Sequence, residues 1–477
     1  MYRCRHIQRR GTVVIVVLWA MAIAALVTTG VQLFSFRQAT LGREAVERVQ
    51  ARWAARAGIE YTLAVMTDHT LRPNPDDAFE MTRDMQAVAT GATNHATWDI
   101  RHHQAGRDWF GPQDEHSKIN INREEDRSLL MLFDDISYDT YDAIADWMDE
   151  DNDISTLGVE REYYQGLESP YEPRNGPLHT LGEAELIAGI WPEDFRGEDW
   201  NLNGRLDSNE DDGPISFPPD EADGIMDAGW SGNITVYSVA NGATGSGEPR
   251  IYLRSAEPDD VAKRLGITAE QAQMLIGYGS SKSNKLVRLL NSDAGTSEPS
   301  GANASGNRPS QRNQNQSGQN EQEGEEGEEE QAPEPSDANA GGPTGFTEAQ
   351  IKMILEETCI EDPHDRTPGK MNINTVPAPL LRDILEEGMS LDEAIADEIL
   401  YMRESRPEGI VYLGDLKKIP AMNSAIMDQL SARFTTASNV FTISSRGRSQ
   451  ATGLEVEITA VVDRSTVPVR ILEYREQ

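Results

Sequence analysis

The chain has 477 residues, room for two or three domains, and a formal net charge of −37 at pH 7. So acidic a surface repels nucleic acid and phospholipid headgroups and suits divalent cations or basic partners. The sequence contains no Gly-rich phosphate loop, no nucleophile elbow and no Cys/His set at zinc spacing, and therefore indicates no enzyme class.

The first elements predicted are a basic leader and a long helix. Arginines precede Gly11, and an apolar run extends from Thr12 to about Gly30. About 20 such residues cross a bilayer core of roughly 30 Å, and the basic flank stays cytoplasmic. Proline is absent from 37 to 66, where apolar residues recur at helical spacing, so one helix should continue beyond the membrane. A cleaved secretory signal, an ordinary anchor and a coiled-coil stem are the alternatives.

The next stretch predicts a loop, a strand and two helices. Residues 68–97 are polar and rich in Pro and Asp, and residues 96–102 alternate as a strand does. Residues 129–133 and 138–148 carry apolar side chains at helical spacing. Three histidines lack metal-site spacing and are expected at the surface: His102, His103 and His116.

An acidic loop follows the second of these helices. Counted from Asp149 as position one, carboxylates fall at positions one, three, five and twelve: Asp149, Asp151, Asp153 and Glu160. This is the spacing by which a twelve-residue loop binds calcium through oxygen ligands. Ile154 stands where a turn glycine is expected, so a solvated acidic loop remains an open alternative.

A second loop matches the calcium template in full. Gly204 allows the sharp turn at position six, and Glu210 can bind bidentately at position twelve. The remaining ligand positions are filled by Asp199, Asn201, Asn203, Arg205 through its carbonyl, and Asp207. A chance Gly/Asn/Asp-rich turn is the alternative. Long flanking helices are missing, which predicts a loop-stabilising site and not an opening sensor.

The rest of the chain predicts helical segments and a closing sheet. Residues 234–239 suggest a strand, Thr268 a helix cap, and residues 292–345 a disordered low-complexity segment. Residues 440–444 and 454–463 are expected as strands around a turn at 446–448, with a third strand over 467–474. Three segments look like the starts of related units: 118–122, 250–253 and 370–374.

A glycine between a basic leader and an apolar run resembles the type III signal of type IV pilins and type II secretion pseudopilins. In that family a prepilin peptidase cuts after the glycine, here Gly11, and methylates the new amino terminus, here Thr12. The usual glutamate at the fifth mature position is Val16 here, a departure that fits the K-type minor pseudopilins. A carboxylate in lipid is costly unless a neighbour's charge meets it, and a tip subunit has no neighbour ahead.

Further motifs follow in the order seen in K-type minor pseudopilins: Asp146 to Asp149, Gly158 to Glu160, Tyr163-Tyr164, Pro170-Tyr171, Arg174 to Leu178, Leu181 and Glu185 to Ile187. The resemblance covers the N-terminal helix, roughly residues 98–190 and the C-terminal region, and it fails over residues 197–230. It implies an α+β, pilin-like fold, in which a long, partly transmembrane helix packs on an antiparallel sheet. It also implies a large inserted helical domain of SAM-like or helix-hairpin-helix type, and calcium as a ligand.

The resulting domain prediction divides the chain into seven parts. They are a leader (1–11), a transmembrane and stem helix (12–66), a first pilin-like part (67–122), an inserted helical domain with acidic calcium loops (123–291), a disordered linker (292–345), a second helical part (346–437) and C-terminal pilin-like strands (438–477).

The function implied is that of a non-enzymatic minor pseudopilin capping the tip of a periplasmic pseudopilus. It would be anchored once in the inner membrane, with I- and J-type minor pseudopilins and the assembly platform as partners, met through Val16, Trp53 and Tyr61. A competence-type nucleic-acid receptor is disfavoured because the turn at 419–423 lacks the hairpin glycines, and no nucleic acid is expected. A calcium-dependent adhesin on a pilin-like stalk is the other alternative.

Overall fold

The computed structural model describes residues 11–240, 244, 248–281, 285–291, 345–362 and 367–477. The chain divides into two compact units. The first comprises Met1–Glu248, Arg366–Ala421 and Ala432–Gln477, and the second Pro249–Asp365 and Met422–Ser431. The predicted disordered segment, 292–345, lies outside the described residues except for Gly345.

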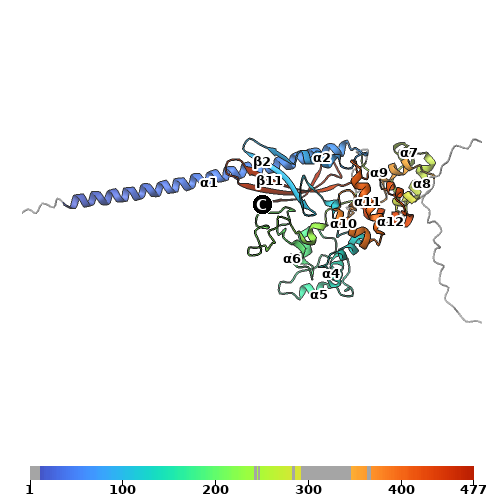
Figure 1. The fold of residues 1–477 in the computed structure, drawn as a ribbon, viewed down its shortest axis with the longest axis horizontal. Helices are drawn as coiled ribbons and strands as arrows, with labels where there is room; N and C mark the ends of the chain where they lie inside the picture. The colour runs from blue at the N-terminus through green and yellow to red at the C-terminus, as the bar shows by residue number, and fades with distance from the viewer. Residues whose placement is uncertain (1–10, 241–243, 245–247, 282–284, 292–344, 363–366) are drawn as a thin grey trace, which may run out of the picture. The chain divides into compact units, whose positions relative to one another are not determined.

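A single helix, α1, runs from Gly11 to Leu71 and confirms the predicted continuous helix (Figure 1). In the described part of the chain, one helix is long and apolar enough to cross a membrane, and it spans Val13–Leu71. Its most apolar window has a mean hydropathy of 2.4 and is 0% buried. From Glu47 onward the helix buries one side, so its two halves have different surroundings.

The core of the first unit is an antiparallel sheet in the order β1-β2-β11-β12-β13, with β3 beside β2 and β4 beside β11. The strands span Thr90–Ala92 (β1), Ala96–Gln104 (β2), Arg107–Phe110 (β3), Gln113–Asp114 (β4), Val440–Ser449 (β11), Glu455–Asp463 (β12) and Arg470–Glu476 (β13). The C-terminal half of α1 packs on this sheet (Figure 1), burying Ile59 and Met66 against Ile100, Ile443 and Ile458. This is the predicted pilin-like arrangement of a long helix on an antiparallel sheet.

Helix and sheet approach closely because small residues face each other. Ala51, Ala54 and Ala55 on α1 are fully buried, and Gly447 on β11 lies against the backbone of Ala51 and Ala55. The predicted turn at 446–448 is therefore wrong: β11 continues to Ser449, and the chain turns only between β11 and β12. Glycine is needed at this position of the strand because a side chain there would push the helix away.

The prediction of a loop over residues 68–97 is also wrong in part. The last turn of α1, the helix α2 (Glu80–Ala87) and the strand β1 lie in this stretch. The helix α2 buries Met85 in the core beneath α1, which explains a helix in a polar segment. Tertiary packing of one apolar side chain outweighs a composition that favours loops.

Short helices fill the rest of the first unit. They span Glu115–Ser117 (η1), Glu124–Arg127 (α3), Ser128–Leu132 (η2), Tyr138–Met148 (α4), Arg161–Gln165 (α5), Leu181–Leu186 (η3), Pro192–Arg196 (α6), Gly229–Asn233 (η4), Ala378–Asp383 (α10), Ile384–Gly388 (η6), Glu393–Ser405 (α11) and Leu413–Lys418 (η7).

The second unit contains several short helices and a strand pair. Its helices are α7 (Pro258–Leu265), α8 (Ala269–Gly279), η5 (Leu286–Asn291) and α9 (Glu348–Glu357), and most of α12 (Ser424–Arg433) belongs to it. Thr268 caps α8 with its side chain, as predicted, and Gln271 completes a capping box.

Three short parallel strand pairs share one pattern: β5 (Ile119–Asn120) with β6 (Ile234–Thr235), β7 (Ile251–Tyr252) with β8 (Thr358–Cys359), and β9 (Met371–Asn372) with β10 (Phe434–Thr435). In each pair the residue after the leading strand donates its N–H to the second residue of the return strand. These bonds are Ile121 to Thr235, Leu253 to Cys359 and Ile373 to Thr435, each 3.0 Å. The structure thus agrees with the prediction of three related units, and residues 118–238 are called the first repeat below.

Two of these units also share a pair of asparagines. Asn122 donates to Leu178 O (2.9 Å) and accepts from Leu178 N (2.8 Å). Asn374 makes the same two bonds to Ile410, at 3.0 and 2.8 Å. Each asparagine fixes an incoming loop by pairing with both polar groups of one backbone residue. In the middle unit, Arg254 occupies this position.

Candidate metal centre

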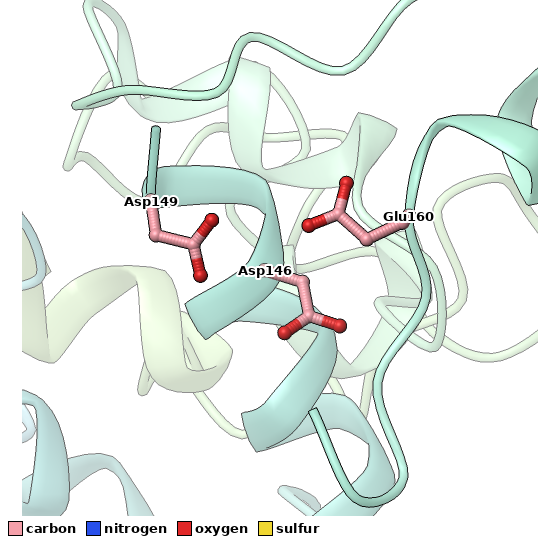
Figure 2. A group of neighbouring side chains, drawn as sticks. All are labelled: Asp146, Asp149 and Glu160. Carbon is pink, nitrogen blue, oxygen red and sulfur yellow. The ribbon is translucent and has the colours of Figure 1, made fainter. Parts of the chain in front are cut away.

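Three carboxylates meet where α4 ends. Asp146 lies in the last turn of α4, and Asp149 caps that helix. The spacing of three places both side chains on one face. The chain then returns at Glu160, the residue before α5. One carboxylate oxygen from each of the three residues lies within 4.8 Å of the others (Figure 2).

Packing beneath the carboxylates holds this geometry. Trp147 and Tyr164, both buried, contact edge to face with ring centres 5.1 Å apart. Gly158 brings the returning loop close, because a Cβ there would overlap the carboxylate of Asp146 and lie 2.9 Å from Asp142 O. A glycine is therefore required at Gly158 for the loop to pass over α4.

Two of the carboxylates each have one oxygen without a hydrogen-bond partner. Glu160 is 3% exposed and its Oε1 has none; Oδ1 of Asp149 has none either. Asp146 is fully buried and accepts only weak bonds from Ser155 N, at 3.2 Å. Within the described residues no ion pair joins these carboxylates to Lys or Arg. Buried charges without partners are costly, so the arrangement calls for a cation.

The electrostatics point the same way. Burial raises the pKa of Glu160 above its ordinary value, and the carboxylates of Asp146 and Asp149 raise it further. Burial and the neighbouring charge of Asp151 raise the pKa of Asp149. A set of oxygen ligands with excess negative charge fits Ca²⁺, which binds six to eight oxygens in flexible geometry.

Two residues of the ligand set predicted for this first loop lie apart from the carboxylate group. Asp151 and Asp153 are exposed and lie outside the carboxylate group, and Asp151 Oδ1 accepts the N–H of Asp153 at 2.8 Å. The loop has no turn at Ile154 to fold these two side chains inward. Asp146 was missed, although its three-residue spacing from Asp149 at a helix end was visible in the sequence.

The second predicted loop folds around the side chain of Asp199. Asp199 accepts N–H bonds from Asn203 and Gly204, both 2.9 Å, and Gly204 has the left-handed φ of +70° that the sharp turn requires. Asn201 and Asn203 accept from backbone N–H groups two residues on, at 2.9 and 2.7 Å.

The acidic ends of this loop are buried. Asp199 and Glu210 are 4% and 1% exposed, and burial raises their pKa to about 6 and about 7. Asp207, predicted at position nine, instead pairs with Arg446 and accepts from the amides of Asn201 and Asn203. Both oxygens of Asp199 and of Glu210 accept backbone N–H bonds, whereas Glu160 Oε1 and Asp149 Oδ1 in the first group accept none.

The expectation of surface histidines is wrong for His103 and His116, which are 7% and 1% exposed. His116 Nδ1 lies 2.7 Å from Lys370 O, and His103 Nδ1 lies 2.9 Å from Asp108. Each ring fills a structural position, and neither histidine belongs to the described carboxylate group.

The residues predicted for processing and partner contact lie along α1. The helix begins at Gly11, next to Thr12. Val16, Trp53 and Tyr61 are 66%, 59% and 55% exposed, so all three remain available for contact. Tyr61 also stacks on Trp98 with ring centres 5.5 Å apart.

Comparison with known proteins finds a family match over part of the chain. Residues 112–197, which contain the carboxylate group, match a family model described as type II secretion system protein K. Together with the long N-terminal helix on an antiparallel sheet, this match supports a minor pseudopilin. Among the minor pseudopilins, the match supports the K type.

A solved structure from enterotoxigenic Escherichia coli, a crystal structure of the GspK-GspI-GspJ complex of the type 2 secretion system, shares 11% identity. The alignment covers 91% of this chain and 99% of that one, with a TM-score of 0.41. No curated protein matches the sequence.

Proposed function

We propose that this chain is a structural subunit at the tip of a type II secretion pseudopilus, held in the inner membrane by α1 before assembly. The family match over residues 112–197 carries the proposal. The exposed apolar half of α1 suits first a lipid bilayer and then a bundle of like helices. Its role is to support protein export mechanically, without catalysis.

The proposed tip position is supported by the size of the subunit and by Val16. The chain between β4 and β11 adds three related units with many short helices to the pilin core, and a subunit of this size is poorly suited to repeated stacking. Val16 replaces a glutamate that would need a cationic neighbour in lipid. The partners proposed are I- and J-type minor pseudopilins and the assembly platform.

Partner contact through α1 is testable by co-purification. Replacing Trp53 and Tyr61 together with Asp places charge on the exposed stem, and recovery of partner pseudopilins should fall at least about tenfold. The matched control is Tyr401→Asp, on α11, where the side chain is 66% exposed. Deleting residues 292–345 should leave recovery unchanged. Unchanged recovery with the Asp pair, or gold labelling along the whole filament and not at one end, would refute the tip model.

Processing at Gly11 is the second test. Intact-mass analysis of membrane-extracted protein should show a chain that starts at Thr12 and carries an N-methyl group. A chain starting near Ala25 would indicate ordinary signal peptidase and contradict the pseudopilin assignment.

We also propose calcium as the ligand of both loops. The residues Asp146, Asp149 and Glu160 form the first site, supported by the partnerless oxygens. The second loop would use Asp199, Asn201, Asn203, the carbonyl of Arg205 and Glu210, supported by its template spacing and buried carboxylates. At each site the protein supplies oxygens that are positioned by backbone N–H groups or by a helix end. The ion would stabilise a loop that buries few apolar side chains.

A further inference from the structure

An insertion interrupts the last helical segment of the first repeat. The helix α6 stops at Arg196 and η4 begins at Gly229; residues 198–228, called the insert, lie between them. Glu198 N donates to Asp227 O at 2.5 Å, which closes the insert at its base. Phe195 and Trp230 pack edge to face across the junction, with ring centres 5.0 Å apart. The core of the repeat is therefore continuous beneath the insert.

The insert reaches the pilin-like sheet with its first half. Arg205 is 8% exposed and donates to Asp99 on β2 at 2.7 Å and to Ser444 O on β11 at 3.5 Å. The carbonyl of Gly204 accepts the N–H of His103 on β2 at 2.7 Å. One turn of the insert is thus bonded to two strands.

Two arginines of the sheet reach back to the insert. Arg446 on β11 pairs with Asp207 and also donates to Glu457 on β12 at 2.7 Å. Arg475 on β13 donates to Leu202 O at 3.0 Å. The insert is therefore bonded to three strands directly and to a fourth through Arg446.

These bonds lie on the sheet face opposite α1. Ser445 donates to Ala55 O on α1 at 2.8 Å, so its side chain points toward the helix. Side chains alternate along a strand, which places Ser444 and Arg446 on the other face. The sheet is held by α1 on one side and by the insert on the other.

We propose that the insert is a clasp that fixes the first repeat against this second face of the sheet. Most of its bonds involve an arginine side chain, and breaking one of these leaves a charged group without its partner. The insert is attached to the repeat at its closed base. Because its first half is bonded to the sheet, these bonds also limit rotation of the repeat relative to the sheet. The contacts involve arginine side chains and backbone carbonyls, and the proposal stands apart from calcium binding.

The test uses the full-length, detergent-extracted protein with two arginines changed, Arg205→Gln and Arg475→Gln. Neither side chain is a proposed calcium ligand. Spin labels at Ala451→Cys, beside the sheet, and Glu168→Cys, in the first repeat, report the distance between the two parts in a background with both native cysteines replaced, Cys4→Ser and Cys359→Ser. The distance distribution should broaden, and the amide of His103 should exchange at least about tenfold faster. Arg470→Gln, exposed on the same strand as Arg475, is the control and should change neither.

A second variant removes the clasp entirely, with residues 198–228 replaced by a two-glycine link across the closed base. It should broaden the distance distribution at least as much as the arginine pair. The excision also removes the second proposed calcium loop, so the arginine pair, measured at one calcium concentration, decides the test. An unchanged distribution and unchanged exchange in the arginine pair would overturn the clasp, even if the excised chain fails to fold.

Discussion

Calcium at about 100 times its dissociation constant is expected to stabilise the folded protein by about 2.7 kcal/mol for a single site. The gain arises because Asp146, Asp149 and Glu160 form a negatively charged group only in the folded chain. Glu160→Gln should remove most of this gain, since it deletes a ligand whose Oε1 has no other partner. Urea unfolding of the extracted protein, with calcium or with chelator, measures the effect.

A matched control distinguishes the loss of a ligand from the loss of one negative charge near the site. Glu162→Gln removes one negative charge from an exposed position on α5, two residues from the site, and should keep the full calcium gain. Glu210→Gln tests the second loop independently. If neither Glu160→Gln nor Glu210→Gln reduces the calcium gain, both loops are acidic segments without a bound ion.

The second loop also predicts a dependence on pH. Burial raises the pKa of Asp199 from 3.8 to about 6 and that of Glu210 from 4.5 to about 7. The folded, calcium-free protein therefore holds protons that the unfolded chain has released, and its stability should fall as pH rises from about 4 to about 7. Calcium displaces those protons, so its stabilising effect should grow over the same range. A calcium gain that shrinks toward neutral pH would contradict this linkage.

The sequence predicted the elements whose signals are long or local. The apolar run and the proline-free stretch after it sufficed for α1, and period-two alternation sufficed for β2 and β12. Thr268 was predictable because its capping contacts lie within three residues. The carboxylate group was predictable in part, since the spacing placed Asp149 and Glu160 in one loop.

The features that the sequence did not predict depend on contacts between distant segments. His103 and His116 contact segments that return from far along the chain: His103 N donates to Gly204 O, and His116 Nδ1 lies beside Lys370 O. Asp151 and Asp153 point to solvent because Gly158, and not a mid-loop turn, brings the chain back over α4. The attachment of the insert to the sheet relies on arginines at 446 and 475, which no local pattern connects to residues 199–210.

Gly447→Ala is expected to destabilise the protein by about 3 kcal/mol or more, although it adds one methyl group. Gly447 was assigned to a turn from sequence, whereas in the structure it lies in β11 where α1 crosses the sheet. A Cβ there would overlap Ala51 O and lie 2.7 Å from Ala55 N. Both atoms belong to the helix backbone, so no rotamer change can relieve the clash, and α1 must move off the sheet.

The effect is measured by urea unfolding of the extracted chain and by hydrogen exchange along β11. Gly182→Ala is the matched control: a Cβ at Gly182 meets nothing within 4 Å, and the change should stay within about 0.5 kcal/mol. Displacing α1 would also alter the stem that carries Trp53, so Gly447→Ala should weaken recovery of partner pseudopilins while Gly182→Ala does not. A loss of stability below about 1 kcal/mol, with normal recovery, would show that helix and sheet lie further apart than described.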